Sequence, residues 1–333
     1  MIEVSNLTKE FKTNKKYPGF KGAIKSFFSK EYTIKKAVDN MSFKIKDGEV
    51  VGYIGANGAG KSTTIKMMTG ILTPTSGKVE VNGIIPYKDR ERNAMNIGVV
   101  FGQRTQLWWD LPLSESFSLL KDIYNVDEKD YEERMNFLNE VLEIEDFILS
   151  PVRTLSLGQR MRADLAASLI HNPEIIYLDE PTIGLDVVVK EKVRNAIKEI
   201  NKKYNTTIIL TTHDLEDIEE LCHRIIIIDK GVKIYDGSLE EIKNKYGYMT
   251  TVAMQIKENK INSNLNINSH FSLESEDLNV TEEDGKIMIN YNKNTISLTE
   301  IIDYFMKNYT IQDFSIKETS IDDIIKKIYR KEV

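Results

Sequence analysis

The sequence predicts an α/β fold with a largely parallel sheet, followed by a smaller α+β domain beyond residue 245. Residues 55–63 read Gly-Ala-Asn-Gly-Ala-Gly-Lys-Ser-Thr and lie between a strand-like run and a helix-like run. A second apolar run, 175–178, ends in the carboxylates Asp179 and Glu180. Short apolar runs of this kind are typical of strands buried in a parallel sheet, whose carboxyl edge carries the ligand site.

Length and composition are those of an ordinary globular protein. The 333 residues suffice for one large domain and a smaller one, with 41% hydrophobic and 29% charged residues. The net charge of −6 argues against nucleic-acid binding by bulk electrostatics.

The chain shows no sign of secretion or membrane insertion. Its single cysteine, Cys222, cannot form an internal disulfide, which suits a reducing cytoplasm. No apolar run approaches the roughly 20 residues that a membrane-spanning helix needs. The first seven residues lack the basic-then-apolar order of a signal peptide. We expect any work at a membrane to be done through other chains.

The glycine-rich run at 55–63 has the chemistry of a phosphate-binding loop. Its glycines allow a tight turn in which successive N–H groups point at the α- and β-phosphates. The positive end of the following helix adds to this anion site. A chance glycine-rich turn is the alternative, and the flanking strand and helix patterns disfavour it. The loop predicts binding of a nucleoside triphosphate by Gly55, Asn57, Gly58, Gly60, Lys61, Ser62 and Thr63.

Two further runs complete this site. Asp179 is placed to hold Mg²⁺ together with the Ser62 hydroxyl, while Glu180 can polarise a water aimed at the γ-phosphate. Alone, an apolar strand that ends in Asp-Glu is weak evidence for a nucleotide site, but it becomes strong evidence when it lies downstream of a phosphate loop. His213 follows another apolar run, 206–210, and is expected at the same sheet edge, although a lone histidine is usually structural.

Six motifs occur in the order found in the ATP-binding subunits of ABC transporters, which residues 1 to about 240 resemble. They are the phosphate loop, a glutamine at Gln103, the signature Leu155-Ser156-Leu157-Gly158-Gln159, the run into Asp179-Glu180, Gly184-Leu185-Asp186, and Thr211-Thr212-His213-Asp214. The resemblance implies a P-loop NTPase fold of the ABC type: a RecA-like core, an antiparallel β subdomain and a helical subdomain at about 104–170. We assign residues 1–245 to this nucleotide-binding domain and 246–333 to an accessory domain.

The resemblance also implies roles for single residues, with ATP and Mg²⁺ as cofactors. Phe11 would stack on adenine, although a plain core position is the alternative. Glu180 would be the general base, and His213 would hold the γ-phosphate. Ser62, Gln103 and Asp179 would ligate the metal. Contacts across a dimer would come from Ser156, Gly158, Gln159 and Asp186.

Two positions depart from the common family pattern. Leu157 occupies a place where glycine is usual, and because leucine avoids positive φ, the signature must adopt an ordinary backbone conformation there. The glutamine region also reads one residue longer than usual. Gln103 is our choice for the metal-sensing glutamine, with Gln106 in reserve.

Residues 102–112 and 155–165 resemble those of one group of bacterial exporter ATPases. These are the viologen-type multidrug exporters, related to the daunorubicin-resistance and polysaccharide export ATPases. Both tryptophans, Trp108 and Trp109, fall in the region that faces the membrane subunit in this family. Neighbouring side chains cannot share one face of a regular element, so we expect one in the core and the other as a contact.

A basic insertion at about 12–36 is the least typical part of the first domain. The segment 9–36 holds nine lysines and two acidic residues, and it contains an apolar stripe at helical spacing: Phe20, Ile24, Phe27 and Phe28. A helix against a membrane surface or partner and a solvated β-hairpin insertion are both consistent with this pattern.

The tail from 246 onward alternates strand and helix signals and has no catalytic constellation. Strands are expected at 251–256, 278–283, 286–291 and 310–317, with a loop at 259–268 and a turn at Asp284-Gly285. Capping boxes at Ser297 and Ser320 predict two helices. A dimerisation or regulatory module and a mere packing extension are the two interpretations.

Taken together, the sequence predicts an ATPase that works as a head-to-tail homodimer or heterodimer. It would power export of a drug-like or other small amphipathic substrate through separate integral membrane permease subunits. The protein would lie at the cytoplasmic face of the cell membrane as a peripheral protein, without a nucleic-acid partner.

Three alternatives to this function remain. They are a polysaccharide or lipid-linked glycan export ATPase, a soluble ABC-type ATPase acting on ribosomes or DNA, and a non-hydrolysing regulatory module. The chain contains a single cassette and no sustained heptad repeat, which argues against an ATPase that acts on ribosomes or DNA. Its catalytic motifs are intact, which argues against a non-hydrolysing regulatory module. Substrate identity is not encoded in this chain.

Overall fold

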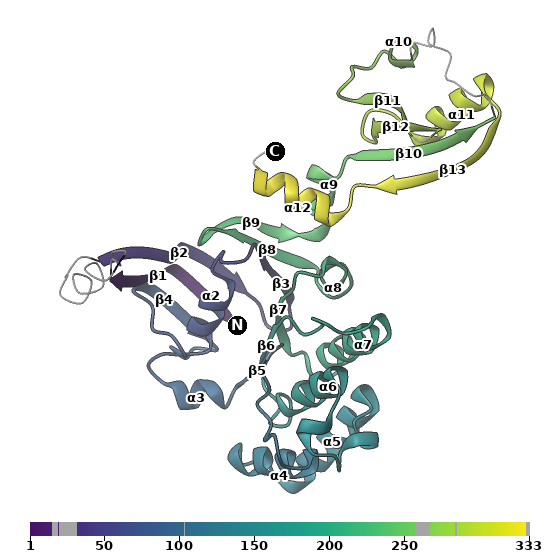
Figure 1. The fold of residues 1–333 in the computed structure, drawn as a ribbon. Coiled ribbons are helices and arrows are strands. Elements are labelled where there is room, and N and C mark those ends of the chain that lie inside the picture. The colour runs from purple at the N-terminus through teal and green to yellow at the C-terminus, as the bar shows by residue number, and fades with distance from the viewer. Residues whose placement is uncertain (15–18, 20–31, 103, 258–266, 284, 331–333) are drawn as a thin grey trace. The chain divides into compact units, whose positions relative to one another are not determined.

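The computed structural model describes residues 1–14, 19, 32–102, 104–257, 267–283 and 285–330. The chain divides into two compact units, Met1–Gly237 and Ser238–Val333. Among the described residues, the first unit contains two sheets and the second unit one (Figure 1), and each unit has its own hydrophobic core.

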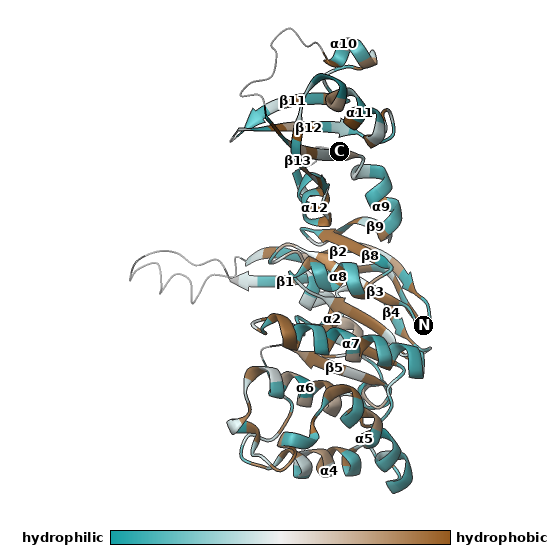
Figure 2. Ribbon diagram, turned by 90° about the vertical axis from the view of Figure 1, so that its right-hand side faces the viewer, coloured by the Kyte–Doolittle hydropathy of each residue, from teal (hydrophilic) through white to brown (hydrophobic). Residues whose placement is uncertain are grey.

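A six-stranded sheet forms the centre of the first unit, in the order β5-β6-β7-β3-β8-β9. The pairs β5/β6, β6/β7, β7/β3 and β3/β8 are parallel. Such strands are covered on both faces and are therefore apolar throughout, as Figure 2 shows in brown for β3, β5 and β8. The strands are β3 (Val50–Gly55), β5 (Ile97–Phe101), β6 (Ile175–Asp179), β7 (Thr207–Thr211), β8 (Arg224–Asp229) and β9 (Val232–Ser238).

Helices connect these strands. The phosphate loop leads from β3 into α2 (Lys61–Met68), and α7 (Val187–Tyr204) and α8 (Leu215–Leu221) follow β6 and β7. The apolar side chains of α2 and of the first strands form one buried core, which includes Tyr53, Ile65 and Met68.

An antiparallel sheet in the order β2-β1-β4 forms the second layer of this core. It consists of β1 (Ile2–Asn14), β2 (Tyr32–Ile45) and β4 (Ser76–Val81), with the short helix α3 (Arg90–Ala94) after it. The first and last residues of the expected insertion belong to strands, because Lys12–Asn14 pair with residues 32–34 of β2. The apolar stripe from Phe20 to Phe28 lies outside the described residues.

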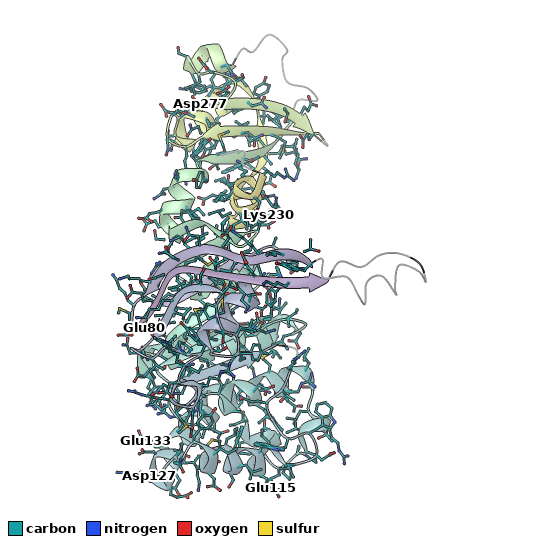
Figure 3. The ribbon with its side chains drawn as sticks, turned by 90° about the vertical axis from the view of Figure 1, so that its left-hand side faces the viewer. Glu80, Glu115, Asp127, Glu133, Lys230 and Asp277 are labelled. Atoms are coloured by element: carbon teal, nitrogen blue, oxygen red, sulfur yellow. The ribbon has the colours of Figure 1, made fainter. Side chains whose placement is uncertain are left out.

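The helical region between β5 and β6 contains α4 (Leu113–Ile123), α5 (Glu128–Leu142) and α6 (Leu157–Ala167). Two 3₁₀ turns, Glu145–Phe147 and Val152–Thr154, lead into α6. Its surface is charged, as Glu115, Asp127 and Glu133 show in Figure 3. Parallel core, antiparallel sheet and helical region are the three parts expected from the sequence.

The expectation for the two tryptophans is wrong. Trp108 and Trp109 are 39% and 49% exposed, so neither is in the core. They lie in an irregular segment between β5 and α4, where the alternation of a regular element does not apply. The neighbouring Leu107 is buried there instead.

The second unit is a four-stranded antiparallel sheet in the order β11-β12-β10-β13. The strands are β10 (Met249–Ile256), β11 (Leu278–Glu283), β12 (Lys286–Asn292) and β13 (Ile311–Glu318). The helices of this unit are α9 (Leu239–Tyr246), α10 (Ile267–Phe271), α11 (Leu298–Asn308) and α12 (Ile321–Arg330). Ser297 caps α11 with a complete capping box, as expected.

Two details of the second unit differ from the sequence reading. Asn268, expected in a loop, belongs to the short helix α10. The two units divide before α9, whereas the sequence boundary at 245 falls at the end of this helix, because α9 packs against α12 of the same unit. In the part of the chain that the structure describes, no helix is both long and apolar enough to cross a membrane.

Candidate functional site

A cavity of 860 Å³ lies at the carboxyl ends of β3, β6 and β7. Ligands bind at this edge of open α/β sheets. The cavity brings together residues that are far apart in the chain, because the strands that carry them are neighbours in the sheet. Its lining includes Phe11, Lys35, Ala56, Asn57, Gly58, Gly60, Lys61, Ser62, Thr63, Phe101, Gly102, Arg104, Asp179, Glu180 and His213.

The phosphate loop depends on glycine where its backbone turns. Gly60 caps α2 with a φ of 111°, and a Cβ there would lie 2.5 Å from the carbonyl oxygen of Ala37. Only glycine adopts this conformation in this space. The turn directs the start of α2 and its free N–H groups into the cavity.

Lys61, the first residue of α2, is buried and donates a hydrogen bond to the carbonyl oxygen of Gly55. Burial lowers the pKa of its ammonium group, while the nearby carboxylates of Glu180 and Asp179 act in the opposite direction. A buried cation beside helix α2 is suited to an anionic ligand, which would offset the cost of its desolvation.

Asp179 ends β6, and its carboxylate accepts a hydrogen bond from the Thr211 hydroxyl at the end of β7. This hydrogen bond fixes the carboxylate at the sheet edge. Thr211 is a residue of the site to which the sequence analysis assigned no role. It could have been found, because it occupies the last position of the strand that precedes His213.

Glu180 adopts a left-handed conformation with a φ of 59°, which non-glycine residues rarely take. Its N–H donates to the carbonyl oxygen of Thr211 at 2.9 Å. Its carboxylate lies beside His213, with 3.4 Å between Oε1 and Nε2, and it accepts from the His213 N–H at 3.2 Å. Strained backbone of this kind persists where neighbouring contacts hold it, and it clusters at functional sites.

Phe11 lies on β1 beside Lys35 of β2, and both line the cavity. Phe11 is 39% exposed, so the interpretation of Phe11 as a plain core residue is wrong. The ammonium group of Lys9 lies 5.4 Å from the ring centroid. The exposed aromatic face and adjacent cations are suited to a nucleobase and its phosphates.

The signature residues have a different location. Ser156 caps α6 in a reciprocal capping box with Gln159, and Leu157 begins the helix with ordinary backbone geometry, as expected. Gly158 packs so closely against α7 that a Cβ would lie 2.9 Å from Val189 Cγ1. Asp186 caps α7. In the part of the chain that the structure describes, the cavity lining includes neither Asp186 nor any of the signature residues 156–159.

Gln103 lies outside the described residues, and the reserve residue Gln106 is turned away from the cavity. Its side-chain amide donates to the backbone carbonyl oxygen of Asp164 on α6 at 3.3 Å, and its backbone N–H donates to the carboxylate of Asp164 at 3.2 Å. The Thr105 hydroxyl donates to the same carboxylate at 2.8 Å. Asp164 therefore attaches the segment after Gln103 to the helix that begins at the signature. No motif in the sequence pointed to this contact.

Asp164 makes the stability of this region depend on pH. Burial raises the pKa of its carboxyl from 3.8 to about 6. Well below pH 4 the carboxyl is protonated in both states. Between about pH 4 and pH 6 the unfolded chain loses this proton while the folded state keeps it, so the folded state loses stability over this range, and the loss levels off above it. This shift of about two pKa units corresponds to the order of 3 kcal/mol. Asp164→Asn should therefore gain stability relative to the unmodified chain between pH 4.5 and pH 7.5, measured by denaturant unfolding.

Asp146→Asn, at an exposed position, is the matched control for this experiment. Parallel changes in the free energy of unfolding for Asp164→Asn and the unmodified chain across this pH range would contradict the assigned cause.

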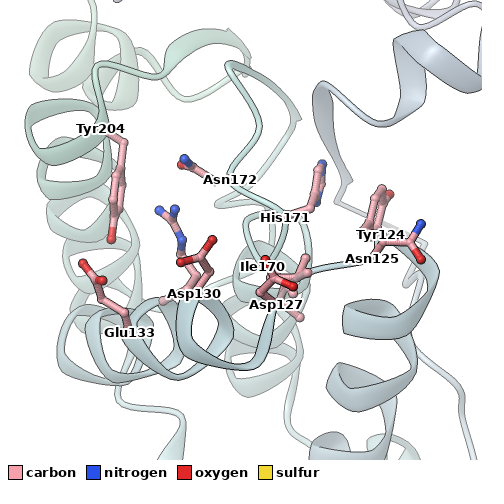
Figure 4. A pocket seen from close by; sticks show the side chains of 11 residues that line it. Tyr124, Asn125, Asp127, Asp130, Glu133, Ile170, His171, Asn172 and Tyr204 are labelled. Atoms are coloured by element: carbon pink, nitrogen blue, oxygen red, sulfur yellow. The ribbon is translucent and has the colours of Figure 1, made fainter.

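A separate cavity of 370 Å³ lies in the helical region, and none of the predicted site residues lines it (Figure 4). Its wall includes His171, whose ring stacks on Tyr124 at a centroid distance of 3.8 Å. Burial lowers the pKa of His171 to about 4, so this histidine is neutral at physiological pH. Its contacts with Tyr124 and with the carbonyl oxygen of Ile97 are structural.

The fold and the 860 Å³ cavity define a nucleotide-binding protein of the P-loop class. Comparisons with known proteins narrow this class. The family model described as ABC transporter matches residues 38–183.

Several curated relatives carry the same family name. An uncharacterized ABC transporter ATP-binding protein of Methanocaldococcus jannaschii is 35% identical over 221 residues, which cover 66% of this chain and 79% of that protein. The ABC transporter ATP-binding protein NatA of Bacillus subtilis is 34% identical over 65% of this chain and 87% of its own length. ABC transporter A family member 9 of Dictyostelium discoideum is 32% identical over 96% of this chain, which spans only 38% of that protein.

Solved structures agree with this result. A dimeric ATP-binding cassette in a post-hydrolysis state with ADP and Pi superposes with a TM-score of 0.59 at 27% identity, over 72% of this chain and 99% of that chain. CbiO1 from Clostridium perfringens, part of an ABC transporter complex, gives a TM-score of 0.59 at 26% identity, over 73% and 90% of the two chains.

This chain belongs to the family of ABC transporter ATP-binding proteins. It is an ATP-binding ATPase subunit of the ABC type, and the resemblance, fold class and enzyme class predicted from the sequence are confirmed.

Proposed function

We propose that this chain binds MgATP in the 860 Å³ cavity and hydrolyses it as a head-to-tail dimer. The observation that carries the proposal is the separation of the motifs within one chain. The phosphate loop, Asp179, Glu180 and His213 share the cavity, whereas Ser156 is exposed at the start of α6 and outside it. A second subunit would supply its signature residues Ser156, Gly158 and Gln159 to the nucleotide held in this cavity.

The oxygen donors of the cavity are suited to Mg²⁺. This ion prefers one or two protein oxygens together with substrate phosphates. Ser62 and the carboxylate of Asp179, oriented by Thr211, line the same cavity, and Gln103 is the further ligand that we propose. When bound, the ion would neutralise developing charge on the phosphates.

The remaining residues act on the water and the γ-phosphate. Glu180 would accept the proton of the attacking water, and its backbone position places the carboxylate toward His213. His213 would hold the γ-phosphate, and Phe11 would stack on the adenine ring. Asp186 would link the two sites of the dimer.

We infer that ATP hydrolysis by this chain powers export. NatA is named an ABC transporter ATP-binding protein, and LnrL of Bacillus subtilis, which is 32% identical over 68% of this chain, is named a linearmycin resistance ATP-binding protein. We infer that the first unit, Met1–Gly237, is the nucleotide-binding domain and that the protein acts peripherally, at the cytoplasmic face of the membrane, with permease subunits. The exposed Trp108 and Trp109 are suited to contact those subunits. A drug-like or other small amphipathic molecule is the proposed substrate.

Shared sites predict that activity depends on association. The ATPase rate per subunit of the full chain should rise with protein concentration, because a monomer lacks the signature residues opposite its nucleotide. Steady-state rates measured over a concentration series, alongside light scattering, would test this. A rate per subunit that stays constant in a demonstrably monomeric preparation would rule out shared sites.

The variant Ser156→Arg tests whether Ser156 acts on the nucleotide of the other subunit or on the nucleotide of its own subunit. It should lower the rate at high protein concentration but leave ATP affinity unchanged at low concentration, where the chain is monomeric. Lost ATP affinity of the monomeric variant would place Ser156 in the cavity of its own subunit instead.

A further inference from the structure

The strand β13 forms an edge of the sheet in the second unit. It pairs with β10 on one side, and the order β11-β12-β10-β13 leaves its other side without a strand among the described residues. Residues 312–318 are all exposed. A long edge strand of this kind is a ready template for pairing with another chain, which proteins usually block.

Two apolar side chains of this strand, Phe314 and Ile316, lack a cover. In the register with β10, Phe314 lies opposite Met254 and Ile316 opposite Val252, so all four share one face of the sheet. Met254 and Val252 are fully buried in the core formed with α11, whereas Phe314 and Ile316 are 44% and 47% exposed. The core therefore covers β10 and reaches Ile311 at the start of β13, but it leaves Phe314 and Ile316 uncovered.

The sequence of β13 is complementary to itself. In an antiparallel pair of two copies with the twofold axis at Ser315, Phe314 lies opposite Ile316 of the other copy. In the same register Asp313 lies opposite Lys317 of the other copy, on the opposite face of the sheet. Directly opposed apolar pairs and opposite charges stabilise antiparallel strands.

We propose that β13 pairs with β13 of a second copy of this chain, in antiparallel register about Ser315, to form a continuous eight-stranded sheet. The proposal adds a second contact to the head-to-tail dimer proposed above, yet it requires neither nucleotide nor the signature residues. Two linked contacts would raise the effective concentration of one subunit at the other.

A cysteine at the twofold axis tests the register. Side chains directly opposite in an antiparallel pair are close enough to be cross-linked. The chain's own cysteine, Cys222, is buried and therefore a poor competitor. The full chain with Ser315→Cys should form a disulfide-linked dimer under mild oxidation without ATP. The matched control Glu282→Cys, on the other edge strand β11, should not.

Charge reversal makes the test specific. In the Ser315→Cys background, Asp313→Lys or Lys317→Asp alone should lower the yield of cross-linked dimer by roughly tenfold, because both charge pairs become repulsive. A mixture of these two variants should cross-link to each other, since every pair is then opposite in charge. This mixture also shows that both variants are folded.

The cross-linking should persist in the Lys61→Ala background, which separates this contact from nucleotide-driven association. Equal yields from the cysteines at 315 and 282, no recovery in the mixture, or loss of cross-linking with Lys61→Ala would each overturn the proposal.

Discussion

Replacing Glu180 by Gln should lower ATP turnover by roughly 100-fold or more, because the variant loses the group that accepts the proton of the attacking water. The amide keeps the size of the side chain and one oxygen, which can still accept from the His213 N–H as the carboxylate does. ATP binding should therefore persist, and a nucleotide-bound dimer should accumulate. Steady-state turnover and size-exclusion chromatography with ATP would measure both effects.

A matched exposed position serves as the control for Glu180→Gln. Glu115→Gln on α4 removes the same charge from the surface of the helical region (Figure 3), and its turnover should equal that of the unmodified chain. Undiminished hydrolysis by Glu180→Gln, with the membrane subunits present as well as absent, would show that another group is the base.

Replacing Lys61 by Ala should weaken ATP binding by roughly ten- to a hundredfold. The estimate follows from the loss of a charge-assisted hydrogen bond to phosphate, worth about 1.5–3 kcal/mol. The stability of the nucleotide-free protein should not fall in parallel, because burial already lowers the pKa of Lys61 and so disfavours its charged form. Equilibrium binding of a fluorescent ATP analogue and denaturant unfolding would separate these two quantities.

Lys202→Ala, at an exposed position on α7, is the matched control for Lys61→Ala. It removes the same charge far from the cavity lining and should change neither quantity. Unchanged affinity in Lys61→Ala would contradict the role of this lysine as a phosphate ligand.

Much of the fold follows from local patterns. The run at 55–63 predicts a strand, a loop and a helix, and the structure contains β3, the loop and α2 in this order. The capping boxes at Ser297 and Ser320 and the alternation at 251–256 likewise predict elements of the second unit that the structure contains. Such signals can be read from sequence because caps, turns and periodicity involve residues within a few positions of one another.

Burial was the property that local patterns predicted least well. Trp108 and Trp109 are both exposed, although one of them was expected in the core. Hydropathy alone cannot distinguish these side chains from core residues, since large apolar groups occur in both places.

The sequence by itself therefore determined the family, the ATPase chemistry and the identity of the phosphate loop, because the glycines and Lys61 act within one short segment. Only the tertiary structure decided which distant residues meet. Its strand order β6-β7-β3 brings Asp179, Glu180 and His213 to the loop, and the same packing leaves Ser156 outside the cavity. The physical reason is that strand order and burial depend on contacts between segments far apart in the chain, which no short window of sequence contains.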